Sequence, residues 1–138
     1  MTDKFATYPS LANRCVVITG GGSGIGAAMV HEFALQGARV VFLDVAEECS
    51  AELVASLAGQ CAHAPVFVPC DLTDIPATQA VLHSIFDKYG APSVLVNNAA
   101  SDDRHNFAEV TPEYWDQRMA VNLKHQFFVG QAVAPAPL

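Results

Sequence analysis

Short apolar runs alternate along the chain with longer amphipathic stretches. Four of the runs are rich in β-branched residues and contain no polar interruption, which predicts strands buried on both faces. These predicted strands are Arg14–Thr19, Arg39–Leu43, Val66–Val68 and Val94–Val96. Because a stretch of helical length follows each run, the alternation predicts right-handed βαβ crossovers and a parallel sheet. The fold class expected is α/β, with helices in layers on both faces of the sheet.

The first two amphipathic stretches predict helices whose buried faces can be read from the spacing of their apolar residues. In the first helix, Ile25, Met29 and Phe33 lie four positions apart, and Gly37 is a natural stop. The second predicted helix spans Ala46–Ala58. Its inner stripe is expected to consist of Cys49, Leu53 and Leu57.

The last two helices begin with recognisable capping residues. Asp74 precedes a helix whose apolar stripe is Val81, Leu82, Ile85, Phe86 and Tyr89. Thr111 and Pro112 begin a longer helix that is expected to reach about Ala134, with Pro135 and Pro137 ending it. One face of this long helix carries Trp115, Met119, Leu123 and Phe127.

Length and composition restrict the classes of protein that fit. The 138 residues predict a single domain over 1–138. With 51% hydrophobic and 15% charged residues, the composition is that of a folded protein. A net charge of −7 argues against nucleic acid or an acidic membrane as partners. No apolar run approaches the length of a membrane span, so we expect a cytoplasmic protein.

The four cysteines are Cys15, Cys49, Cys61 and Cys70, and they form no C-x-x-C pair. We therefore expect them to act as small apolar side chains in a reducing compartment, without disulfides or a bound metal.

A glycine-rich segment, Thr19–Gly26, joins the first predicted strand to the first helix. Five of its last seven residues are glycine, which would be costly inside a regular element and is useful in a sharp turn. Amides at the start of the following helix, together with its dipole, favour an anion such as a pyrophosphate. The segment predicts a phosphate-binding turn.

An aspartate follows the second predicted strand at a position that suits nucleotide binding. Asp44 lies eighteen residues after Gly26, close to the spacing at which a carboxylate accepts hydrogen bonds from the adenosine ribose hydroxyls. A carboxylate there repels a 2′-phosphate, so NAD is favoured over NADP. The alternative is that Asp44 only caps the next helix.

The glycine spacing Gly20-x-x-x-Gly24-x-Gly26 resembles that of the short-chain dehydrogenase/reductase family. Three later stretches, Asp71-Leu72, Asn97–Ala100 and Val121–Leu123, resemble further motifs of the family in the same order. The resemblance implies a Rossmann-type fold and an NAD-dependent oxidoreductase that oxidises a hydroxyl or lactol group of a small alcohol or sugar. It covers nearly the whole chain.

The resemblance also implies which residues contact the cofactor. These ten cofactor residues are Gly20, Ser23, Gly24, Ile25, Gly26, Asp44, Asp71, Leu72, Asn98 and Ala99. In the family, the acid matching Asp71 binds the adenine amino group, although an aspartate after a strand is also a common turn residue. Asn98 and Ala99 match a stretch that lines the cofactor ribose and steadies the sheet. Ala100 replaces the usual glycine, and we expect this exchange to be harmless.

Asn122 matches the family's catalytic asparagine. Its proposed role there is to kink the long helix, so that a main-chain carbonyl binds a water molecule of the proton relay. A mid-helix asparagine without a partner is unfavourable, which supports a functional role. The alternative is a polar residue on a solvated helix face.

A polar loop, Ser101–Asn106, follows the fourth predicted strand. Its run Asp102-Asp103-Arg104-His105, together with the Tyr8–Leu11 lead-in, resembles family members that oxidise aldoses, such as bacterial xylose dehydrogenases. Asp103 and His105 are therefore candidate substrate residues. The alternative is a solvated surface loop. Neighbouring residues rarely converge on one ion, and no metal site is predicted.

The family's catalytic tyrosine and the lysine four positions after it have no match in these residues. Ala12, Ser93 and Arg118 follow Tyr8, Tyr89 and Tyr114 at that spacing. The family's sheet also has more strands than four, so an open strand edge and an uncovered helix face are expected. The chain resembles the N-terminal half of a dehydrogenase that is a homo-oligomer when full-length. The alternatives are an inactive NAD-binding fragment and a fragment that docks onto an intact homologue.

Overall fold

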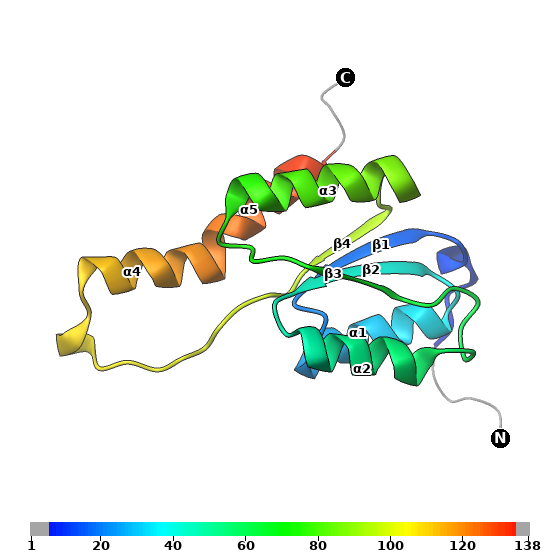
Figure 1. Ribbon diagram of the computed structural model, residues 1–138, viewed down its shortest axis with the longest axis horizontal. Coiled ribbons are helices and arrows are strands. Elements are labelled where there is room, and N and C mark those ends of the chain that lie inside the picture. The colour runs from blue at the N-terminus through cyan, green and yellow to red at the C-terminus, as the bar shows by residue number, and fades with distance from the viewer. Residues whose placement is uncertain (1–5, 135–138) are drawn as a thin grey trace.

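The computed structural model describes residues 6–134, and they form a four-stranded parallel sheet with helices on both faces (Figure 1). The strands are β1 (Cys15–Thr19), β2 (Arg39–Asp44), β3 (Val66–Pro69) and β4 (Val94–Asn97). Their order is β3-β2-β1-β4, and all three neighbouring pairs are parallel. The predicted α/β fold of Rossmann type is confirmed, and β1 lies between β2 and β4.

The five helices are α1 (Gly24–Leu35), α2 (Glu47–Leu57), α3 (Ile75–Tyr89), α4 (Pro112–Met119) and α5 (His125–Val133). Helices α1 and α2 cover one face of the sheet, and α3 and α5 cover the other (Figure 1). The predicted caps are present, since the side chains of Asp74 and Thr111 accept from the amides of Ala77 and Tyr114. Short 3₁₀ turns that were not predicted lie at Pro9–Leu11 and Phe107–Glu109.

Strands β1 and β2 form the centre of the core because their side chains alternate between two apolar layers. Val16 and Phe42 point into the layer shared with α1 and α2. Val17 and Leu43 point into the layer shared with α3 and α5. All five residues of β1 are buried, as an uninterrupted apolar run predicts.

The predicted inner face of α1 is wrong by one position. Ile25 is 73% exposed, and the buried residues of the helix are Gly26, Val30 and Ala34. The helix rests on the sheet through these smaller residues, which allow the glycine turn to lie close against its first turn. Met29 and Phe33 are only half-buried at the side of this contact.

The predicted inner stripe of α2 is wrong at its first member. Cys49 is exposed, and Ser50 takes the buried position beside the glycine turn. Of the other cysteines, Cys15 and Cys70 are buried and Cys61 is half-buried, all as free thiols. Burial raises the pKa of the Cys15 and Cys70 thiols.

The long predicted helix is divided in two by a π-helical turn, Ala120–Lys124, that joins α4 to α5. Helix α5 packs beside α3, whereas α4 extends away from the sheet (Figure 1). The predicted uncovered face is present: Trp115 is 60% exposed and Phe127 is 64% exposed. Pro135 and Pro137, predicted to end the helix, lie outside the described residues. No helix in residues 6–134 combines the length and apolarity needed to span a membrane.

Candidate nucleotide site

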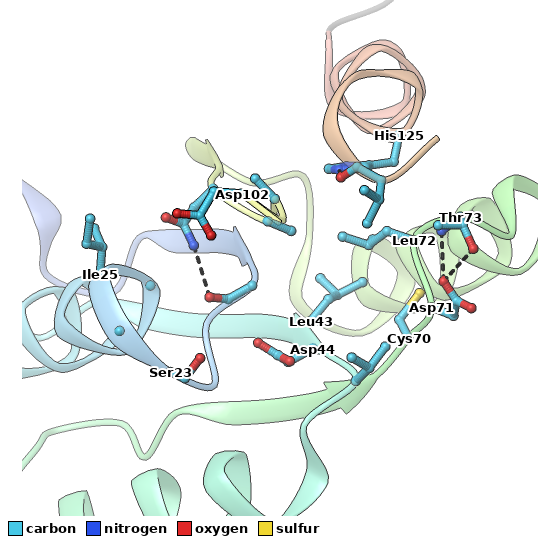
Figure 2. Close-up of a pocket in the computed structure, with 18 residues that line it drawn as sticks. Ser23, Ile25, Leu43, Asp44, Cys70, Asp71, Leu72, Thr73, Asp102 and His125 are labelled. Atoms are coloured by element: carbon cyan, nitrogen blue, oxygen red, sulfur yellow. Dashed lines mark hydrogen bonds between the residues drawn. The ribbon is translucent and has the colours of Figure 1, made fainter. Parts of the chain in front are cut away.

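A cleft of about 690 Å³ lies at the carboxyl ends of the strands, between the glycine turn, the segments after β2, β3 and β4, and the long helix (Figure 2). All ten cofactor residues predicted from the sequence line this cleft. In an open parallel sheet ligands bind at the switch point, which here lies beside β1: the chain runs from β1 to β2 and β3 on one side and then crosses from β3 to β4 on the other. The fold therefore gathers residues that lie far apart in the chain, from Gly20 to His125, around one cleft.

Two glycines of the turn adopt backbone angles that other residues disfavour, with φ of +67° at Gly20 and +54° at Gly24. A Cβ atom at Gly26 would overlap the carbonyl oxygen of Gly20, which excludes a side chain there. A Cβ atom at Gly24 would meet no protein atom within 4 Å, so the space in front of it is open to a ligand. The turn is thus closely packed at Gly26 and open to the cleft at Gly24.

The first helical turn of α1 faces this open space. Ser23 precedes the helix with an extended backbone, and its side chain makes no capping hydrogen bond to the helix. Ser23 and Ile25 both line the cleft at the start of α1 (Figure 2). Amides of a helix N-terminus, with the positive end of its dipole, attract an anion.

The turn is locked to β4 through Asn98 and Thr19. The amide group of Asn98 donates to the carbonyl oxygens of Thr19 and Gly20 at 3.2 and 3.0 Å. In return, the buried Thr19 hydroxyl oxygen accepts from the backbone amides of Asn98 and Ala99 at 3.0 and 3.1 Å. Asn98 thus holds the start of the glycine turn in place.

The turn is locked to β2 through Asp44. One carboxylate oxygen accepts from the amide of Gly22 at 2.8 Å, and the other accepts from the amide of Ala46 at 2.9 Å. The second contact is with the N-cap residue of α2 and orders the turn before the helix, but it is not a capping bond, because no side chain caps α2. The two amides orient the carboxylate while each oxygen keeps lone-pair capacity for a further donor.

Asp71 lies after β3 and is exposed at the far end of the cleft (Figure 2). One of its oxygens accepts from both the amide and the hydroxyl of Thr73, at 2.9 and 2.7 Å. These hydrogen bonds lower the pKa of Asp71, because they favour the charged form. The turn alternative is therefore correct for this oxygen, and the second oxygen stays free for a donor. Leu72 beside it is buried.

Asn122 lies in the π-helical turn and does not line the cleft. Its side-chain oxygen accepts from the amide of Ser101 at 2.8 Å, so it does not simply face solvent. The widened turn shifts each amide from its usual acceptor, and side chains supply replacement donors. Gln126 donates to the Asn122 carbonyl at 3.1 Å, and the buried His125 donates to the Val121 carbonyl at 2.8 Å.

The two predicted substrate residues are not brought into the cleft. Asp103 is exposed and forms an ion pair with Arg118 on α4 at 3.4 Å. His105 contacts the Tyr114 hydroxyl at 3.3 Å. Arg118 also donates to the hydroxyl and the carbonyl oxygen of Ser101, so α4 holds this loop at several points.

Sequence reasoning missed several residues that the cleft includes. Cys70 and Thr73 stand directly before and after the predicted pair Asp71-Leu72, so the motif that indicated this pair could also have indicated them. Asp102 follows β4 at the same edge as Asn98, which was a usable signal. No sequence pattern indicated His125. It lines the cleft because it lies one helical turn after Val121, which also lines it. Asn13 is the only non-glycine residue in 6–134 with a positive φ, so Ala100 adopts a backbone conformation that does not require glycine.

The charge of the cleft is negative. Asp44, Asp71 and Asp102 line it, and no lysine or arginine does so among the described residues. A bound phosphate would therefore depend on backbone amides. A cluster of three or more metal-ligating side chains is also absent from residues 6–134.

Comparison with known proteins gives matches along nearly the whole chain. A family model described as short chain dehydrogenase matches residues 14–137. The D-xylose 1-dehydrogenase of Caulobacter vibrioides is 55% identical over 130 residues, which are 94% of this chain and 50% of that protein. The probable galactose dehydrogenase GalD of Rhizobium meliloti is 50% identical over 135 residues, which are 98% of this chain and 53% of that protein.

Among solved structures, a metagenomic short-chain oxidoreductase in complex with NADP superposes with a TM-score of 0.85 at 31% identity. The match covers 91% of this chain and 57% of that one. The chain spans about half the length of the curated relatives that it matches.

Proposed function

The chain belongs to the short chain dehydrogenase family, and from this premise we propose that it supplies the NAD site of an oxidoreductase that oxidises a hydroxyl or lactol group of an aldose. The observation that carries the proposal is the cleft itself, which is lined by all ten cofactor residues and by an oriented acidic group after β2. The sugar is suggested by the names of the two relatives, which are a xylose and a galactose dehydrogenase.

The residues of the cleft fit a dinucleotide. The open face of Gly24 and the first amides of α1 would receive the pyrophosphate, since a side chain is absent just where a ligand must approach closely. Asp44 would accept from the adenosine ribose hydroxyls, and the free oxygen of Asp71 would accept from the adenine amino group. Asn98 would keep the turn and β4 in register while the nucleotide binds.

Two features support NAD over NADP. The Asp44 carboxylate is held in place by Gly22 and Ala46, so it cannot easily swing away from a 2′-phosphate. The part of the cleft that the structure describes also has no lysine or arginine to neutralise that phosphate. Two negative charges about 4 Å apart near a protein surface repel by roughly 4 kcal/mol. We therefore infer a preference for NAD.

A nicotinamide cofactor, when bound, accepts the hydride from the oxidised carbon. The chain's own contribution is to bind and orient that cofactor, and to hold the segment after β4 against the long helix. Asn122 does the latter by accepting from the Ser101 amide, and its backbone lies in the widened turn. We propose Asn122 as the catalytic residue of this part of the protein, through its main-chain carbonyl, which accepts from Gln126 and keeps a second lone pair for a water molecule.

The alternative function is NAD binding without turnover. The 138 residues contain no tyrosine followed four positions later by lysine, which is the pair that transfers the proton in the family. We propose that these residues by themselves bind the nucleotide and do not oxidise sugar. The cytoplasmic location and the homo-oligomeric state of the full-length form remain predictions.

One experiment tests the proposal and separates the two functions. NAD and NADP are titrated calorimetrically into the chain, and the same sample is assayed for NADH formation with D-xylose and D-galactose. We expect NAD to bind at least tenfold more tightly than NADP. Asp44→Asn should reduce this ratio while Asp87→Asn, on the outer side of α3, should leave it unchanged. Absence of NAD binding would contradict the proposal, and turnover would contradict its alternative.

A further inference from the structure

The polar loop after β4 contains two acidic residues, Asp102 and Asp103, which lie in different surroundings. Asp102 lines the cleft, whereas its neighbours Ser101 and Asp103 contact Arg118 of α4. Within the described residues the Asp102 carboxylate forms no hydrogen bond and no ion pair, so both of its oxygens remain available to a ligand. The residue is exposed, and nothing in its own packing requires an acid.

Asp102 and Asp71 mark opposite ends of the cleft (Figure 2). The two residues follow β4 and β3, which are the two outer strands of the four-stranded order. If the adenine lies at Asp71 and the pyrophosphate at the glycine turn, the dinucleotide must run toward β4, and its reacting end then lies beside Asp102. A substrate must approach that end.

The backbone around Asp102 is held firmly enough to present a side chain. Asn122 accepts from the Ser101 amide at 2.8 Å, and Arg118 donates to the Ser101 carbonyl oxygen. These two helix residues lie four positions apart, so they clamp both sides of one peptide segment. By contrast, one oxygen of Asp103 contacts Arg118 and one ring nitrogen of His105 contacts Tyr114, and neither residue lines the cleft.

From this geometry we propose that Asp102 is the substrate-specificity residue of the loop, with its carboxylate accepting hydrogen bonds from hydroxyl groups of an aldose. Asp103 and His105 then hold the loop to α4 and do not contact the sugar. An anionic acceptor suits a ligand that offers several neighbouring hydroxyl donors and is poorly served by a ligand with one. The inference rests on the proposed function, because it takes the direction of the dinucleotide from it.

The test measures binding of sugar to the chain saturated with NADH, so that no oxidation consumes the sugar. D-xylose and cyclopentanol, a ring alcohol with one hydroxyl, are titrated and followed by saturation-transfer NMR. The variants Asp102→Ala, Asp102→Asn, Asp103→Asn and His105→Ala are compared, and NADH affinity is measured for each. A hydrogen bond to a charged group corresponds to a loss of about tenfold or more on removal.

We expect Asp102→Ala to weaken D-xylose binding about tenfold, Asp102→Asn to weaken it less, and cyclopentanol binding to change less than twofold. Asp103→Asn and His105→Ala should change D-xylose binding less than twofold and should keep the NADH affinity. Sugar binding of the Asp102 variants is compared at saturating NADH, so that a change in their nucleotide affinity does not enter the result. Xylose binding that is absent in the parent chain, unchanged in Asp102→Ala, or lost mainly in Asp103→Asn or His105→Ala would overturn the inference. Failure of the parent chain to bind NADH would instead overturn the proposed function.

Discussion

The sheet centre and the long-helix arm, which we define as α4, the π-helical turn and α5 (112–133), both carry regular apolar patterns but differ in what covers them. In β2, Phe42 is completely buried between the sheet and the helices α1 and α2. In the long helix, Phe127 lies on an equally regular stripe and is 64% exposed. An apolar stripe indicates which face of a helix or strand can be buried. Whether that face is buried depends on a second element that packs against it. Within residues 6–134 only the sheet centre has such partners on both sides.

The cleft lies between these two regions, and each region contributes a different set of residues to it. The sheet centre supplies the glycine turn and Asp44, which are tied into the core by backbone hydrogen bonds. The arm supplies Asn122 and Arg118, which hold the loop after β4. We therefore expect substitutions outside the cleft to disturb the end beside the glycine turn less than the end beside the arm.

The largest difference should come from truncating one phenylalanine in each region. Phe42→Ala removes a fully buried ring and should lower the free energy of unfolding by about 3–5 kcal/mol. Phe127→Ala removes a mostly exposed ring and should change it by less than about 1 kcal/mol. Urea denaturation of both variants checks this. Equal losses would show that the arm is packed in solution and would contradict the comparison.

Glycines offer a second contrast of smaller size. Gly26→Ala places a Cβ against the Gly20 carbonyl and should cost roughly 3 kcal/mol, with loss of nucleotide binding. Gly130→Ala in α5 meets no atom within 4 Å and should stabilise by about 0.5–1 kcal/mol through helix propensity. Thermal unfolding with and without NAD measures both effects. A stable, NAD-binding Gly26→Ala variant would mean that the turn adopts another shape.

The smallest expected effect depends on pH and is confined to the cleft. Thr73 lowers the pKa of Asp71, so its bonds stabilise the fold above the ordinary aspartate pKa and are lost as the pH falls through the lowered value. Thr73→Ala should raise the Asp71 pKa, and should cost less than about 1 kcal/mol at neutral pH because the site is exposed. NMR titration and urea denaturation at neutral and acidic pH test this. An equal loss at both pH values would exclude the carboxylate as the cause.

Most of the fold was predictable because its determinants are local. Uninterrupted apolar runs predicted the strands, and Asp74 and Thr111 marked helix starts that the structure confirms. The inner faces of α1 and α2 were predicted less well. Hydropathy assigned Ile25 and Cys49 to the core, but the close approach of the glycine turn favours small residues there, so Gly26 and Ser50 are buried instead.

The candidate site was predictable where a motif follows a strand directly. The glycine turn, Asp44, Asp71 and Asn98 all meet that condition and all line the cleft. For the loop after β4 the strand end indicates only the region, because contacts with α4 decide which of its side chains turns inward. Those contacts engage Asp103 and His105 and leave Asp102 at the cleft.

Amide chemical-shift mapping with NAD tests the central claim most directly, because it reports the binding surface of both regions in one titration. We expect the largest shifts at Gly20, at 23–26, at Asp44 and at 71–72, with smaller shifts at 98–102. The amides of Trp115 and Phe127 on the α4 and α5 stripe should not move. Shifts confined to that stripe, or no shift at saturating NAD, would contradict the assignment of the cleft as the nucleotide site.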